Sequence, residues 1–130
     1  MTIAKIRELL TAELLCGEGD LSQEVYTACG SDMMSDVLAY VKDQAVLLTG
    51  LVNTQVVRTA EMMDMICIVF VRNKKPSEEM ISLAKEHNIV LMSTPKRMYE
   101  ACGILYSEGL NKNSRPCADN GSAANGECHA

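Results

Sequence analysis

Small polar residues follow several apolar runs of this chain, and their chemistry is that of an anion-binding site. Hydroxyl, amide and backbone N–H groups beside helix N-termini favour phosphate and carboxylate ligands. Arg58 and Arg72 could add positive charge. We therefore predict that a nucleotide or another small anionic metabolite contacts Ser31, Thr49, Gly50, Asn53, Asn73, Ser93 and Thr94. The alternative is that these residues only cap helices, because every fold of this kind needs caps.

Patterns typical of catalysis are missing from the same turns. The segment from Thr49 to Asn53 has neither the further glycines of a dinucleotide-binding turn nor the lysine of a phosphate-binding loop. His87 ends a predicted helix, where the dipole alone favours it. We therefore predict no catalytic residue and no enzyme. The alternative is a small phosphate-handling or transferase enzyme that uses the same turns, with Arg58 or Arg72 stabilising charge.

The six cysteines are not spaced as a metal site or a disulfide framework. No C-x-x-C pair occurs, so the common zinc, haem-attachment and thioredoxin signatures are missing. Cys67 lies in an apolar run and Cys102 on an apolar helix face, where a free thiol behaves as a small hydrophobe. Three potential ligands, Cys117, Cys128 and His129, do not specify a site on a flexible segment. We predict free thiols in a reducing compartment, with no metal or cofactor. A redox or metal module is the alternative.

The elements that must position these residues are apolar runs separated by amphipathic helices. A run, a polar turn and a helix follow one another three times between residues 45 and 106. Apolar runs without alternation predict a parallel sheet buried on both faces, which places ligands beyond the carboxyl ends of its strands. We predict a three-layer α/β/α domain with a mainly parallel sheet of about five strands. The strands are residues 25–29, 46–49, 65–71 and 89–92, with residues 14–16 as a short fifth strand or a continued helix.

The helix starts are predicted from cap residues and prolines. Ser31 and Asp32 precede a helix whose core face carries Met34, Val37, Leu38 and Val41. Asn53 is predicted to cap the following helix. Pro76 fits the first position of the next one, and the pair Thr94 and Pro95 repeats that opening before the last helix.

Composition indicates one globular domain, at residues 1–110, followed by a flexible polar tail at residues 111–130. The net charge is −5, and the short pairs at 74–75 and 96–97 are too small for a nucleic-acid-binding face. No apolar run approaches membrane-spanning length and no signal peptide is present, so we expect a cytoplasmic protein without nucleic-acid or membrane partners.

The order of these segments resembles the DRTGG domain family over roughly residues 3–110. The resemblance is carried by residues 14–21 and 24–25, by the run 45–50 that ends in Thr49 and Gly50, by 76–79, and by 88–94 before the last helix. The chain departs from the family at its namesake positions. Leu51 and Val52 stand where the family tends to have Asp-Arg, and Arg72 and Asn73 stand where it tends to have paired glycines.

The resemblance implies a regulatory, non-catalytic module with a fold like that of the amino-terminal domain of HPr kinase/phosphorylase. Relatives accompany CBS domains in some pyrophosphatases and acyltransferase domains in phosphotransacetylases. Stand-alone versions are found near iron-only hydrogenase and sensor-kinase genes of anaerobes. We therefore expect ligand sensing or protein interaction, a link to hydrogenase or energy metabolism, and a homodimer, the commonest assembly.

Overall fold

A computed structural model describes residues 1–38 and 44–110, which form five strands and five α-helices. The strands are β1 (Glu13–Cys16), β2 (Thr27–Gly30), β3 (Ala45–Thr49), β4 (Cys67–Phe70) and β5 (Val90–Ser93). The helices are α1 (Ile3–Leu10), α2 (Met34–Val37), α3 (Thr54–Met62), α4 (Glu78–Glu86) and α5 (Met98–Ser107), and a 3-10 turn covers Glu18–Asp20. The predicted tail at 111–130 and the predicted core position Val41 lie outside the described residues.

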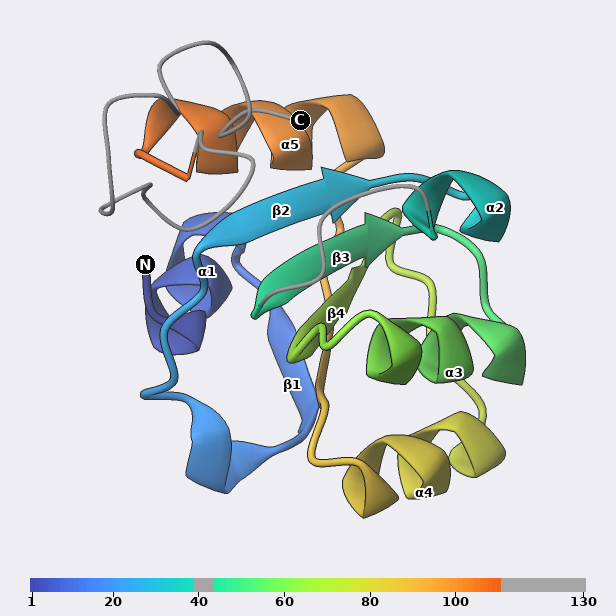
Figure 1. Cartoon of the computed structure of the whole chain (residues 1–130). Coiled ribbons are helices and arrows are strands. Elements are labelled where there is room, and N and C mark those ends of the chain that lie inside the picture. The colour runs from blue at the N-terminus through green and yellow to red at the C-terminus, as the bar shows by residue number, and fades with distance from the viewer. Residues whose placement is uncertain (39–43, 111–130) are drawn as a thin grey trace, which may run out of the picture.

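The strands form one sheet in the order β1-β5-β4-β3-β2 (Figure 1). Strands β2, β3, β4 and β5 are parallel neighbours, and β1 pairs antiparallel with β5. Strand β4 lies at the centre, where an uninterrupted apolar run is buried on both faces. The predicted fold, a mainly parallel five-stranded α/β domain, is confirmed, and residues 14–16 belong to a strand.

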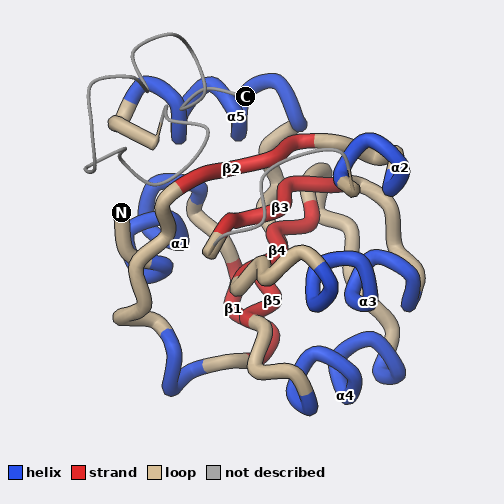
Figure 2. The backbone as a smooth tube through the Cα atoms, viewed as in Figure 1, coloured by secondary structure: helices blue, strands red, loops and turns tan. Residues whose placement is uncertain are grey.

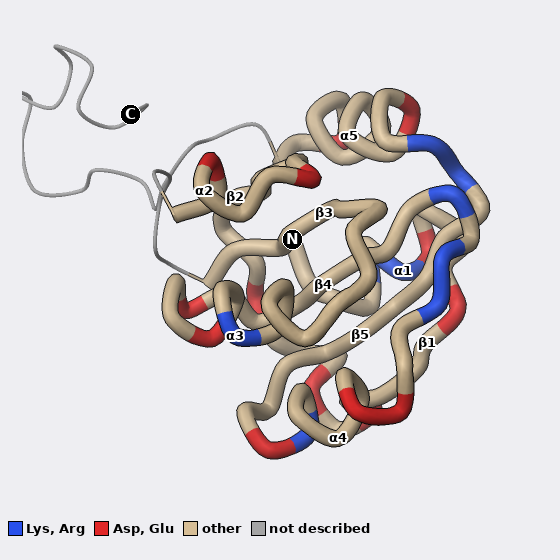
Figure 3. The backbone as a smooth tube through the Cα atoms, turned by 90° about the vertical axis from the view of Figure 1, so that its right-hand side faces the viewer, with Lys and Arg blue, Asp and Glu red and all other residues tan. Residues whose placement is uncertain are grey.

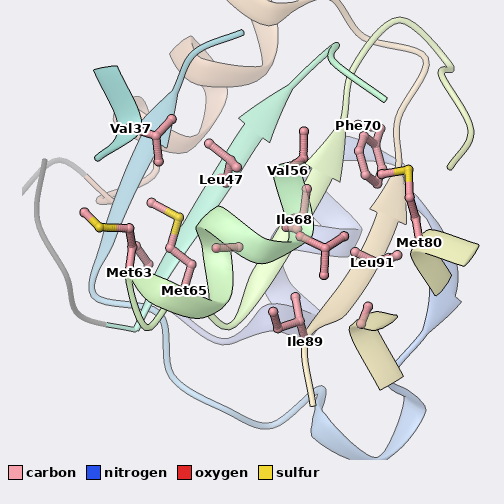
Figure 4. Close-up of a cluster of buried hydrophobic side chains, with 14 of the residues drawn as sticks. Val37, Leu47, Val56, Met63, Met65, Ile68, Phe70, Met80, Ile89 and Leu91 are labelled. Carbon is pink, nitrogen blue, oxygen red and sulfur yellow. The ribbon is translucent and has the colours of Figure 1, made fainter. Parts of the chain in front are cut away.

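Two hydrophobic clusters, one on each face of the sheet, make the domain three layers thick (Figure 2). Helices α1 and α5 pack on one face through Ile3, Ile6, Leu10, Ala101 and Leu105. Helices α2, α3 and α4 cover the other face, where the Met80 side chain lies beside Phe70 and the side chains of Met63 and Met65 lie near each other at the other end of the cluster (Figure 4). Flexible thioethers replace the scarce aromatic residues in this core.

The strand boundaries differ from those predicted because main-chain bonds outside the ladders hold the flanking residues. The strand predicted at 25–29 is Thr27–Gly30, since Val25 N donates to Met1 O at 2.7 Å before the chain joins β3. The strand predicted at 65–71 is Cys67–Phe70, since Met65 N donates back to Ala60 O of α3 at 2.8 Å. The strand predicted at 89–92 is Val90–Ser93, because Ile89 N donates to Ala84 O.

The helix starts also bring corrections. Asn53 caps α3 as predicted, with its side chain accepting from Val56 N at 3.2 Å. Pro76 does not occupy the first helical position, because Ser77 is the cap of α4 and accepts from Met80 N. Helix α5 begins at Met98, after Arg97, rather than at Pro95. Helix α2 follows Met33 without a side-chain cap, so neither Ser31 nor Asp32 caps it.

Candidate functional site

The predicted site residues lie along one edge of the sheet. Strands β2 to β5 run parallel, so the residues that follow them emerge together at their carboxyl ends (Figure 1). Ser31 follows β2, Gly50 follows β3, Asn73 follows β4, and Thr94 follows β5, while Thr49 and Ser93 are the last residues of their strands. Asn53, the cap of α3, lies at the same edge.

An aspartate that was predicted only as a helix cap joins two of these turns. The Asp32 carboxylate Oδ1 accepts from the Thr49 hydroxyl at 3.0 Å and from Gly50 N at 2.6 Å. The Thr49 hydroxyl oxygen in turn accepts from Leu51 N at 3.1 Å. The exposed Asp32 side chain therefore stands where an anion would otherwise meet the Gly50 amide. The sequence feature that could have indicated this role is the position of Asp32, an acidic residue just after a predicted strand.

The Arg72 side chain also lies against Gly50. A Cβ built on Gly50 would collide with Arg72 Nη2, so the missing side chain makes room for the guanidinium. Arg72 is exposed, and its guanidinium forms no hydrogen bond or ion pair within residues 1–38 and 44–110. The carboxylate of Asp32 and a guanidinium free for a ligand thus flank one glycine at the carboxyl edge.

Arg72 and Asn73 are consecutive residues in the left-handed region, with φ of 56° and 60°. That conformation costs a residue with a Cβ about 1–2 kcal/mol, and glycine or asparagine tolerates it best. Two hydrogen bonds to the neighbouring loop maintain this conformation. Arg72 N donates to Lys96 O at 2.8 Å, and Asn73 N donates to Thr94 O at 2.7 Å. The sequence predicted a polar turn here, but Arg72 itself is not a residue type that indicates the left-handed conformation.

Ser93 and Thr94 are buried, and their hydroxyl groups bond to the protein. Ser93 Oγ donates to Lys74 O at 2.7 Å. Thr94 Oγ1 donates to Leu10 O at 2.6 Å and accepts from Lys96 N at 3.2 Å. Ser31 Oγ accepts from Met33 N at 3.0 Å and closes a local turn. These three side chains shape the edge, whereas the groups that face outward are those of Asp32, Arg72 and Asn73.

Two hollows of the surface lie away from this edge. One is over α1, between Ala4, Arg7, Thr11 and Leu21. The other follows α5, between Tyr99, Gly103 and Tyr106. Neither includes a residue of the predicted site.

The thiols of Cys16, Cys29, Cys67 and Cys102 are free. Burial raises the pKa of each of them, and for Cys29 to about 11. They are therefore protonated at neutral pH and poor nucleophiles or metal ligands. In the described part of the chain, no three His, Cys, Asp or Glu side chains are grouped so that they could hold a metal ion. Cys117, Cys128 and His129 lie outside the described residues.

No helix within the described ranges is both long and apolar enough to cross a bilayer.

Comparison with known proteins identifies a family and related solved structures. Residues 5–107 match the family described as the DRTGG domain. A similar solved structure is that of the CBS and DRTGG domains of the regulatory region of Clostridium perfringens pyrophosphatase, complexed with its activator, diadenosine tetraphosphate. It superposes with a TM-score of 0.66 at 18% identity, covering 80% of this chain and 45% of that chain. No curated protein sequence matches the chain.

Proposed function

Because the chain belongs to the DRTGG domain family, we propose that it is a non-catalytic regulatory module that senses a nucleotide or phosphorylated metabolite. The observation that carries the proposal is the exposed Arg72 guanidinium, which lies against Gly50 at the carboxyl edge of the sheet. A guanidinium presents a planar set of donors that matches phosphate oxygens. Helix α3 begins at Thr54, four residues after Gly50, and its N-terminus adds a favourable dipole.

The Asp32 carboxylate favours a ligand that carries hydroxyl groups as well as phosphate. Its hydrogen bonds to Thr49 and Gly50 both use Oδ1, and carboxylates also accept from the hydroxyls of sugars. A bare phosphate near Asp32 would be repelled, whereas a nucleotide can direct its ribose to Asp32 and its phosphate to Arg72. The pyrophosphatase regulatory region binds diadenosine tetraphosphate, which supports testing adenine nucleotides first.

Thermal-shift measurements with adenine nucleotides test this proposal. We expect stabilisation of the wild-type chain, reduced in Arg72→Ala and unchanged in Lys85→Ala, which removes an equal charge from the end of α4. Gly50→Ala is a sharper probe, because it keeps every charge and only displaces the end of the Arg72 side chain. Equal stabilisation of all four proteins would contradict binding at Arg72.

The absence of catalysis is part of the same proposal. The alternative, an enzyme whose charge stabiliser is Arg58 or Arg72, predicts turnover of a nucleotide or phosphometabolite. Turnover that is abolished by Arg58→Ala or Arg72→Ala would replace the regulatory proposal. Stabilisation without turnover supports sensing.

A module of this kind acts on another protein. We propose a cytoplasmic role in which ligand binding alters contact with a metabolic partner, and the family resemblance points to an enzyme of energy metabolism such as an iron-only hydrogenase in an anaerobe. Lack of any ligand-dependent association with such a partner would remove that part of the proposal.

A further inference from the structure

The fold joins two basic loops that are separate in the sequence. The loop after β4 carries Arg72, Lys74 and Lys75, and the loop after β5 carries Lys96 and Arg97. We call these five residues the basic loop pair. Strands β4 and β5 are neighbours, and the bond from Arg72 N to Lys96 O at 2.8 Å ties the two loops together. Figure 3 shows Lys and Arg segments gathered beside the start of α5.

Hydrogen bonds hold the loop pair in one conformation. Buried Ser93 donates to Lys74 O, and buried Thr94 accepts from Lys96 N. Arg72 itself is kept in the left-handed region, at φ 56°. A strained backbone maintained by its surroundings is a frequent feature of binding sites. The backbone of both loops is therefore fixed before any ligand arrives, which lowers the entropic cost of binding.

Most of this charge is not neutralised by the protein. Lys75 pairs with Glu13 at 2.5 Å and Lys96 with Glu100 at 3.7 Å, and both carboxylate side chains are more than half exposed. Such exposed pairs are weak and exchange readily. Arg72, Lys74 and Arg97 form no ion pair in residues 1–38 and 44–110. Five of the chain's 12 Lys and Arg residues thus concentrate positive charge in a protein of net charge −5.

We propose that the basic loop pair binds a chain of three or more linked phosphates. The proposal deepens the proposed function and rests on it, because Arg72 belongs to both sites. A phosphate chain that starts at Arg72 would continue over the loop pair, away from the Asp32 carboxylate. Each further phosphate would meet another cation. The length of the phosphate chain, rather than the presence of one phosphate, would then select the ligand.

The size of the charged surface favours a short polyanion over a nucleic acid. All 17 Asp and Glu residues lie outside the loop pair. A long polyanion would extend beyond the loops toward this acidic remainder and be repelled. A short phosphate chain ends before it leaves the two loops.

Calorimetric titration of the full chain with inorganic tripolyphosphate, pyrophosphate and orthophosphate tests the inference. We expect tripolyphosphate to bind at least about tenfold more tightly than orthophosphate, with affinity falling as salt is raised. The double variant Lys74→Ala/Arg97→Ala should lose about tenfold in tripolyphosphate affinity and change little for orthophosphate. The matched control is Lys5→Ala/Lys85→Ala, which removes the same charge from α1 and α4 and should bind as wild type.

The outcomes separate this inference from the proposed function. If adenosine monophosphate binds through Arg72 but tripolyphosphate binds no better than orthophosphate, the inference fails and the proposed function stands. If tripolyphosphate binds through Lys74 and Arg97 but no nucleotide binds, the proposed function fails and the phosphate-chain site remains. Equal losses in the two double variants, or tighter binding of an oligothymidylate at matched phosphate concentration, would overturn the inference.

Discussion

Arg72 combines a strained backbone with an exposed charge, and the two can be measured separately. Replacement by glycine removes the steric cost of φ 56° and adds the chain entropy of glycine. We expect Arg72→Gly to raise the free energy of unfolding by about 0.5–1 kcal/mol, measured by urea denaturation. The control is Arg58→Gly inside α3, which should lower it by about 1 kcal/mol because its backbone is helical.

A loss of stability in both glycine variants would contradict the left-handed conformation of Arg72. If Arg72→Gly raises the free energy of unfolding, it also provides a stable protein that lacks the guanidinium. That variant should bind nucleotide more weakly, so stability and binding would change in opposite directions, as expected where strain is kept for function.

The buried thiol of Cys29 should make stability depend on pH in the alkaline range. Desolvation raises its pKa from 9.0 to about 11 in the folded state. The folded chain therefore keeps this proton longer than the unfolded chain, and the resulting stability is present below pH 9 and lost as pH rises through about 11. Urea denaturation from pH 8 to 11 should show a steeper decline for wild type than for Cys29→Ala. If the free energy of unfolding falls equally with pH in wild type and in Cys29→Ala, the raised pKa of Cys29 is contradicted.

At the scale of one element, Asn53 tests whether a predicted ligand residue acts as a cap. Its side chain accepts from Val56 N at 3.2 Å at the start of α3. We expect Asn53→Ala to cost about 1 kcal/mol of unfolding free energy, and Asn53→Asp, which can still cap, to cost little. Urea denaturation gives both values. Equal losses of unfolding free energy in Asn53→Ala and Asn53→Asp would show that the capping hydrogen bond does not stabilise the chain.

The helices and strands were predictable from sequence where hydrophobic burial alone determines them. Buried strands such as β3 and β4 are continuous apolar runs, and the core face of α3 has helical spacing. Their ends were less predictable, because main-chain bonds to distant residues decide them, as Val25 with Met1 shows. Pro76 lies two residues before Glu78, the first helical position of α4, since Ser77 provides the capping hydroxyl.

The site was predictable in position but not in its contacts. Parallel strands bring their carboxyl ends to one edge, which located Gly50 and its neighbours from pattern alone. The pairing of β4 with β5 brings Arg72 to Lys96, a proximity that sequence separation conceals. Likewise, Ser93 and Thr94 could not be recognised as inward-facing without the loops that they hold.

At the scale of the whole molecule, a homodimer remains our prediction. Met33, Leu38 and Met62 are 62%, 43% and 58% exposed, and they come from the segments of α2 and α3 on one face of the sheet. Adaptable Met side chains suit such contacts. Multi-angle light scattering at micromolar concentration should give twice the chain mass, and a clean monomer mass would contradict the prediction.

The central claim is that a nucleotide binds at the carboxyl edge of the sheet, beside Arg72. Backbone amide chemical shifts, followed by NMR during titration with adenosine triphosphate, test it most directly because they locate the ligand. We predict that the largest changes occur at Gly50, Leu51, Arg72 and Asn73, and that Asp64 and Asn88, at the opposite edge, are unaffected. Changes centred on Asp64 and Asn88, or no change at millimolar ligand, would contradict the claim.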